Sequence, residues 1–468
     1  MEKIESEKNK NEKEKEKEKK INIIKETIKK CVIYSNEPNK PPFSFKRKIQ
    51  NASNIIKFNY LKRCLKSKYP ENTKVKLYNK EYDLRNENEK NNFESDFNNI
   101  IFCSYRKNYP KQKSYKNNVE YNSDCGWGCM IRSSQMIVAK AVYEILIYEK
   151  NNIVNSIFNT ISLFMDFPFN FNEIPKIFHK YKEKIQEEIN KINNENNNNN
   201  INNNINNENN NNINNNINNN NQIQKIYPPF SIQVICSIGQ ILNKSCGEWF
   251  SDVNMPHIFK IINRNMNIFS NFKILPFQSS IIISKIIKHC FIESNDDKLT
   301  EDQYFLYNNK KYIFKNYGLI FVSVRLGISS IESYYYSSIK NLFNCKECIG
   351  FIGGKNYSAS YFIGCDDINF LYLDPHFAKN GVIPPLNNEN IQSYIDKTLF
   401  QLPIQKLQPA FTIGFLIKNI DDFKDLYKYM NDNCKIQNPC FFFQEDKMMS
   451  NKINSELENN IIKTKDDF

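Results

Sequence analysis

The sequence Ser123-Asp124-Cys125-Gly126-Trp127-Gly128-Cys129-Met130 leads from polar residues, through two glycines and a cysteine, into an apolar segment that continues to Ile147. Apolar residues on nearly every side of that segment predict a buried helix. Gly126 and Gly128 permit a tight turn before it. Cys129 then begins the helix, where free N–H groups and the macrodipole favour an anion. A thiol in such a place has a lowered pKa, which is how a nucleophilic cysteine is prepared.

A free cysteine at the start of an apolar helix is more often a buried, unreactive core residue. Cys129 is therefore a candidate nucleophile only if the chain also supplies a base and an orienting group. Three of the four histidines are interpreted as surface or capping residues: His179, His257 and His289. His376 differs, because it follows a predicted strand and stands two residues after Asp374. Side chains at i and i+2 of an extended backbone point to the same side, so Asp374 can orient His376 beside a thiolate.

The composition limits the function classes. The net charge of +13 invites a nucleic-acid interpretation, but the lysines are spread along the chain and mixed with glutamates, with no recognisable nucleic-acid motif. Residues 1–22 contain no hydrophobic signal region, and no apolar run approaches the roughly 18 to 20 residues that span a bilayer. Thirteen cysteines without a secretion signal indicate reduced thiols and not a disulfide framework. We therefore expect a cytoplasmic protein that needs no cofactor or metal.

The order of the expected elements indicates an α+β fold. Helices are expected over residues 231–241, 255–268 and 421–430, and strands over 318–326, 361–364, 369–374 and 411–417. Helices before strands favour an antiparallel sheet. Residues 291–311 are expected to form a loop, and Gly353-Gly354 a turn that ends a short strand. Five parts are expected: a charged, mostly disordered extension (1–70), the first part of a catalytic domain (71–192), an Asn-rich disordered insertion (193–225), the second part of that domain (226–430) and a tail (431–468).

Several motifs together resemble the autophagins, the autophagy-related protein 4 cysteine proteases. They are Gly126 to Met130, Tyr105 to Pro110, Val324 to Gly327, Ile352 to Lys355, Tyr361 to Gly364, Tyr372 to His376, Ile413 to Phe415 and Asp421 to Phe423. The resemblance covers roughly residues 75–430, interrupted by the Asn-rich insertion. Two positions depart from the family pattern: Asn356 replaces a proline, and Ser360 replaces a histidine.

This resemblance implies a papain-like fold with a small accessory subdomain and a triad of Cys129, His376 and Asp374. It implies that Tyr105 helps to form the oxyanion hole. It also implies that Trp249 and a mobile loop containing Gly353, Gly354 and Lys355 cover the cleft, so that only glycine fits beside the scissile bond. A tryptophan buried in the core is the alternative interpretation of Trp249.

The partner implied by the resemblance is the ubiquitin-like autophagy-related protein 8, cut after its C-terminal glycine to mature it or to release it from phosphatidylethanolamine. Membrane contact is expected only through that lipidated substrate. Three alternatives remain open: a pseudo-enzyme that binds the modifier without cleaving it, a protease for a related modifier, and, more remotely, a basic RNA-binding protein.

Other short patterns carry weaker hypotheses. Cys345 and Cys348 have CxxC spacing but no second ligand pair in the sequence, so a zinc site is disfavoured. Cys125 stands four residues before Cys129 and could be a resolving thiol after oxidation. Two segments resemble acidic-aromatic peptides that bind by strand addition, and we interpret both as core: Asp96 to Ile100 and Asp422 to Leu426.

Overall fold

A computed structural model describes residues 74–170, 174–187, 190, 225–266, 268–269, 271–355, 358–433 and 438–444, together with residues 22 and 32–33. Most of the expected extension (1–70), the Asn-rich insertion up to residue 224 and residues 445–468 therefore lie outside the described residues. From the extension, β1 (Val32–Ile33) pairs with β7 (Lys225–Ile226), which also pairs with β6 (Phe169–Asn170).

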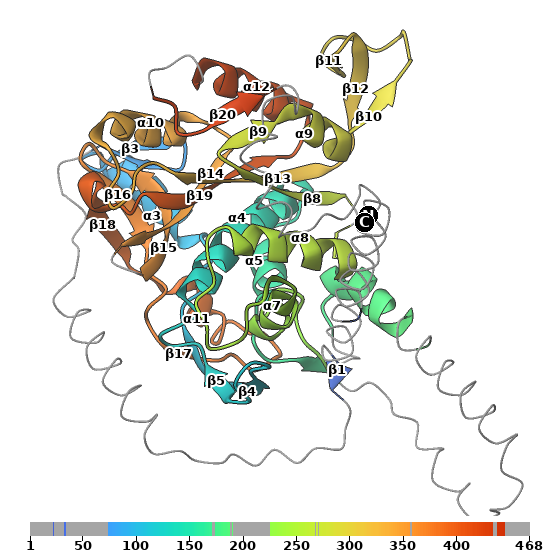
Figure 1. Ribbon diagram of the computed structural model, residues 1–468, viewed down its shortest axis with the longest axis vertical. Helices are drawn as coiled ribbons and strands as arrows, with labels where there is room; N and C mark the ends of the chain where they lie inside the picture. The colour runs from blue at the N-terminus through green and yellow to red at the C-terminus, as the bar shows by residue number, and fades with distance from the viewer. Residues whose placement is uncertain are drawn as a thin grey trace, which may run out of the picture.

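One large mixed sheet forms the centre of the described chain (Figure 1). Its strand order is β18-β16-β15-β14-β19-β13-β8-β9-β20, and the β2-β3 hairpin joins it at β15. The strands are β2 (Lys74–Leu77), β3 (Lys80–Asp83), β8 (Phe272–Gln278), β9 (Ser280–Ile282), β13 (Tyr317–Arg325), β14 (Cys348–Lys355), β15 (Ser358–Cys365), β16 (Asn369–Leu373), β18 (Leu399–Pro403), β19 (Ala410–Ile417) and β20 (Phe442–Gln444). The expected strands at 318–326, 361–364, 369–374 and 411–417 are all present.

Helices cover both faces of this sheet (Figure 1). On the first face, α4 (Cys129–Tyr148) and α8 (Asn254–Met266) pack against the strands, and α5 (Ile153–Ser162) packs against α4 and α7 (Ile232–Gly239) against α8. The second packs against α9 (Ile283–Cys290), α10 (Tyr336–Asn341) and α12 (Ile420–Asn433). In β13, Leu319 and Phe321 belong to the first core, whereas Ile320 and Val322 belong to the second. A strand buried on both faces is typically a continuous apolar run, which is why residues 319–322 are all apolar.

Three expectations about individual elements are wrong or incomplete. The sheet is mostly antiparallel, but β8 pairs with β13 in parallel, because a crossover through α9 connects them. Residues 291–311 are not a loop: β10 (Phe291–Ser294), β11 (Phe305–Tyr307) and β12 (Lys310–Phe314) form a small antiparallel sheet that projects from the molecule (Figure 1). The fold also extends past residue 430, since β20 pairs with β9.

Five further elements lie around the first core. They are α3 (Glu87–Asn98), β4 (Arg106–Lys113), β5 (Glu120–Ser123), β17 (Lys379–Asn380) and α11 (Gln392–Ile395). β4 pairs with β5 and, in parallel, with β17, which begins three residues after His376. This small sheet therefore brings the segment before Cys129 close to the segment after Asp374.

Candidate active site

Cys129 is the first residue of α4, as the glycines and the apolar segment predict. Gly126 has φ +87°, a left-handed backbone that suits glycine, and the N–H groups of Trp127 and Gly128 donate to the carbonyl of Asp124. These bonds close the turn that precedes the helix. The Cys129 side chain is buried beside Tyr105 and Ala359, and the residue is 8% exposed.

His376 and Asp374 lie together as predicted, but Pro375 and His376 form a turn after β16 and not the expected extended segment. Asp374 Oδ1 accepts a hydrogen bond of 3.0 Å from the His376 backbone N–H and a second one from His376 Nδ1. A carboxylate that accepts both bonds fixes the orientation of the ring. Burial disfavours the charged imidazolium, but hydrogen bonds to Asp374 and Cys129 outweigh it and raise the pKa of His376 to about 10.

The pKa of the Cys129 thiol shifts in the opposite direction, downward. Burial disfavours the thiolate, but a hydrogen bond to His376, its positive charge, the Ala359 N–H and the Tyr105 hydroxyl together hold the pKa of Cys129 below its ordinary value. Both shifts favour the thiolate–imidazolium pair over the neutral pair. Burial raises the pKa of Tyr105, so its hydroxyl stays protonated and can donate.

Tyr105 also connects the two halves of the site. Its N–H donates to the Pro375 carbonyl over 2.8 Å, and its carbonyl accepts from the Lys379 N–H over 2.9 Å. Its ring meets the His376 ring edge-on, with 5.2 Å between centroids. A phenol held between the nucleophile and the histidine can donate to an anion that forms there.

Trp249 lies beside the nucleophile turn. Its indole Nε1–H donates to the Gly126 carbonyl over 2.8 Å, and the residue is 57% exposed. It is therefore no core anchor.

The turn expected at Gly353-Gly354 is instead strand, in a β-hairpin, and the gating role of this segment stays a prediction. Gly353, Gly354 and Lys355 are the end of β14, where Gly354 pairs with Ala359 of β15. A strand continues through the glycines because the neighbouring chain fills the space of their missing side chains: a Cβ on Gly353 would come within 2.9 Å of Phe411 Cβ. Through Ala359, the hairpin contacts Cys129 directly.

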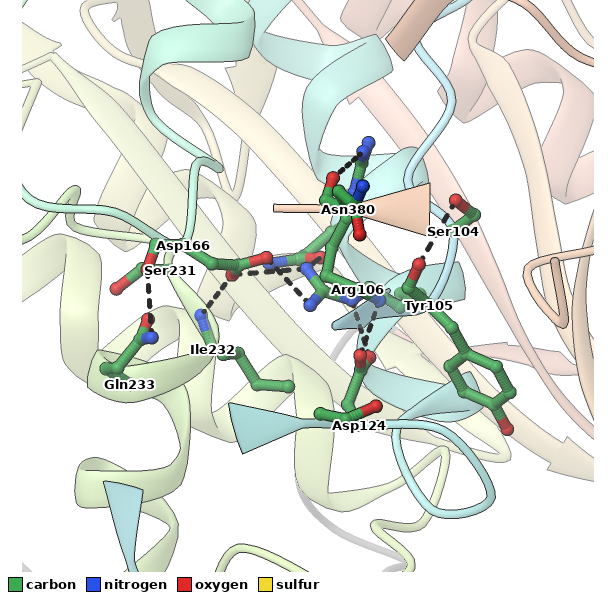
Figure 2. Close-up of polar contacts among 12 residues, drawn as sticks. Ser104, Tyr105, Arg106, Asp124, Asp166, Ser231, Ile232, Gln233 and Asn380 are labelled. Carbon is green, nitrogen blue, oxygen red and sulfur yellow. Dashed lines mark hydrogen bonds and ion pairs between the residues drawn. The ribbon is translucent and has the colours of Figure 1, made fainter. Parts of the chain in front are cut away.

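A buried ionic cluster that the sequence did not predict joins α4 to two acids, Asp124 and Asp166, which Figure 2 labels. Asp124, Arg132 and Asp166 have no exposed surface, and Arg132 pairs with both carboxylates at 2.7 and 2.8 Å. An arginine inside an otherwise apolar helix signals a buried partner, but the sequence does not say which acid supplies it.

The CxxC pair and the apolar residues of the two acidic-aromatic segments belong to the buried core. Cys345 and Cys348 are buried, and burial raises the pKa of each thiol. In the described part of the chain, no group of three or more potential metal-binding side chains occurs. Phe97, Phe423 and Leu426 are buried in the core, which confirms that interpretation of both acidic-aromatic segments. Cys125 packs against the Cys129 cluster, and its role as a resolving thiol stays a prediction.

The sequence profile of the peptidase C54 catalytic domain matches residues 90–429. The chain belongs to the peptidase C54 family. Similar proteins include cysteine protease ATG4D of Xenopus laevis, 22% identical over 385 residues that cover 82% of this chain and 77% of the relative. Cysteine protease ATG4 of Candida albicans is 26% identical over 333 residues, 70% of this chain and 56% of the relative. Human cysteine protease ATG4C is 22% identical over 375 residues, 75% and 74% of the two chains.

This member of the peptidase C54 family is therefore a cysteine protease of the autophagy pathway, with the papain-like fold of that family. Among the described residues, no helix is both long and apolar enough to cross a membrane.

Proposed function

We propose that this protease cleaves after the C-terminal glycine of the ubiquitin-like modifier autophagy-related protein 8, with Cys129 as nucleophile, His376 as base and Asp374 as orienting group. The observation that carries the proposal is the continuous set of hydrogen bonds from Asp374 through His376 to Cys129 at the start of α4. Family membership supports a ubiquitin-like autophagy modifier as the substrate.

In this reaction the Cys129 thiolate attacks the carbonyl carbon of the glycine. The negative charge moves to the carbonyl oxygen, where the Tyr105 hydroxyl and the N-terminus of α4 stabilise it. The imidazolium of His376 gives its proton to the leaving amine, and the C–N bond breaks to leave a thioester. His376, now neutral, takes a proton from water while the water oxygen attacks the thioester carbonyl. The C–S bond then breaks, which restores the thiolate and the imidazolium and frees the glycine carboxyl, whose proton goes to solvent.

The same steps cleave two substrates, because both contain an amide of that glycine. In the precursor the leaving amine belongs to the next residue, and in the lipid conjugate it belongs to phosphatidylethanolamine. We propose that contact with a membrane occurs only through the lipidated substrate.

Glycine selectivity follows from the groups around Cys129. Cys129 is 8% exposed and packs against Ala359 of the hairpin that contains Gly353, Gly354 and Lys355, and Trp249 donates to the turn that precedes Cys129. We propose that the hairpin and Trp249 both shift when the modifier enters and that only a residue without a side chain then fits.

We place this activity in the cytoplasm. All ten cysteines in the described part of the chain are free thiols, which suits a reducing compartment.

The test uses modifier with a short extension beyond its C-terminal glycine, incubated under reducing conditions with the wild-type protein and with Cys129→Ser. Masses of the products should show cleavage after that glycine by the wild type alone. A modifier conjugated to phosphatidylethanolamine on vesicles tests lipid release in the same way.

Two outcomes would change the proposal. Binding without cleavage of either substrate would indicate a pseudo-enzyme. Cleavage of a different extended modifier, such as ubiquitin, with neither binding nor cleavage of autophagy-related protein 8, would replace the substrate.

A further inference from the structure

Asp124 is a buried carboxylate between the turn that presents Cys129 and the strand that follows Tyr105. Its carbonyl accepts from the Gly128 N–H over 2.9 Å, directly before the nucleophile. Its carboxylate Oδ1 accepts from the Arg106 N–H over 2.6 Å, at the start of β4 (Figure 2). Asp124 therefore joins the nucleophile turn to β4.

Packing ties the same carboxylate to the residue before Cys129. A Cβ placed on Gly128 would come within 2.4 Å of Asp124 Oδ2, so the carboxylate occupies the space of the missing side chain. The backbone that leads into Cys129 thus lies directly against Asp124.

The connection continues to the histidine. Arg106 follows Tyr105, and the Tyr105 N–H donates to the Pro375 carbonyl, between Asp374 and His376. Three hydrogen bonds therefore connect Gly128 to Pro375. The first and the last join backbone atoms, and the middle one, from the Arg106 N–H, is accepted by the Asp124 carboxylate. A further bond, from the Asp124 N–H to the Arg106 carbonyl at 3.2 Å, lies beside the middle one.

We propose that Asp124 is a positioning residue that holds Cys129 within hydrogen-bond reach of His376. The inference rests on the proposed roles of Cys129 and His376, and it adds a third group that touches neither the substrate nor the reacting atoms. It acts through the backbone of Gly128 on one side and of Arg106 and Tyr105 on the other.

The chain offers a matched control in Asp166. Both acids are fully buried and pair with Arg132, Asp124 at 2.7 Å and Asp166 at 2.8 Å. Asp166 Oδ1, however, accepts from the Ile232 N–H at the start of α7 and makes no bond to β4 or to the nucleophile turn. Substituting either acid disturbs the same guanidinium, but only Asp124 links the two halves of the site.

The experiment compares Asp124→Asn and Asp166→Asn with the wild type. Iodoacetamide alkylation of Cys129 is followed from pH 4 to 10 by fragment masses that distinguish Cys129 from Cys125, in folded full-length protein. If Cys129 moves away from His376 in Asp124→Asn, the midpoint of the alkylation profile rises and the rate at pH 6 falls by about tenfold for each unit of that rise. Asp166→Asn should keep the wild-type midpoint.

The direction in which the alkylation midpoint shifts in Asp124→Asn distinguishes a loss of positioning from the loss of a negative charge. Removing a nearby negative charge alone would make the thiolate easier to form and would lower the midpoint. An unchanged or lower midpoint in Asp124→Asn, or an equal rise in Asp166→Asn, would overturn the proposal.

A second variant covers the case in which Asp124→Asn fails to fold. Gly128→Ala keeps every charge but pushes a methyl group toward the Asp124 carboxylate, so it should also raise the midpoint, and an unchanged midpoint would contradict positioning. Because alkylation needs no modifier, a wild type that is alkylated at low pH but cleaves no modifier would remove the proposed substrate and leave this inference standing.

Discussion

At the scale of single residues, the ionisation of Cys129 and His376 sets the pH range of activity. The thiolate forms below the ordinary thiol pKa, and the imidazolium persists to about pH 10. As pH rises, activity therefore appears when Cys129 loses its proton and disappears when His376 loses its own. We expect a broad bell-shaped profile of kcat/KM for cleavage of the extended modifier.

The acidic limb of the pH profile tests whether His376 lowers the pKa of Cys129. A rise of kcat/KM centred at or above the pKa of a free thiol would mean that His376 does not activate Cys129. Circular dichroism at each pH is the control that the protein stays folded.

Asp374→Asn tests the orienting carboxylate. The amide has the size of the carboxylate but no charge, so the ring orientation weakens and the imidazolium loses its principal support. We expect kcat to fall by about 10³- to 10⁴-fold and the alkaline side of the pH profile to move to lower pH. Asp367→Asn, an exposed acid in the turn between β15 and β16, is the control. Wild-type kcat in Asp374→Asn would remove Asp374 from the triad.

At the scale of elements, the placement of Trp249 leads to a prediction about specificity. Its indole caps the nucleophile turn from a loop before α8. In Trp249→Ala, a modifier ending in alanine at the cleavage site should be cut better. The ratio of its kcat/KM to that of the glycine substrate should rise by about tenfold, the typical worth of one methyl group in a tight site.

Trp249→Phe keeps an aromatic ring but lacks the donor to Gly126, so it separates shape from hydrogen bonding. If shape excludes alanine, this variant should stay close to the wild type. An unchanged ratio in Trp249→Ala would mean that the hairpin or the modifier itself selects glycine.

At the scale of the whole molecule, the sheet is buried on both faces, and the core on the second face lies on the opposite side of the sheet from α4. Substitutions in that core should therefore change stability more than they change catalysis. Phe351 in β14 is fully buried and contacts Phe362, Phe370 and Phe411, with ring centroids 4.7 to 5.4 Å apart. Phe351→Ala should lower the free energy of unfolding by about 3–5 kcal/mol in denaturant titrations.

Phe442→Ala is the matched comparison, because Phe442 lies in edge strand β20 and is 59% exposed. Phe442→Ala should change the free energy of unfolding by no more than about 0.5 kcal/mol. A loss of stability in Phe351→Ala no larger than in Phe442→Ala would contradict the two-faced core.

Much of the architecture could be predicted from the sequence, because it depends on local patterns. The apolar segment after Gly126 and Gly128 is enough to start a helix at Cys129, and the continuous apolar run of β13 is enough for a strand buried on both faces. The two-residue spacing of Asp374 and His376 likewise predicted their contact, although a turn closed by the His376 N–H bond to Asp374 produces it, and not an extended segment.

The tertiary structure alone decided what depends on residues far apart in the chain. It paired Arg132 with Asp166, placed Trp249 outside the core and extended β14 through Gly353 and Gly354. It also formed a sheet from the polar segment 291–311, because Phe291 and Phe305 pack against Phe423 of α12. No local pattern contains these contacts, since each needs a partner that the folded chain supplies.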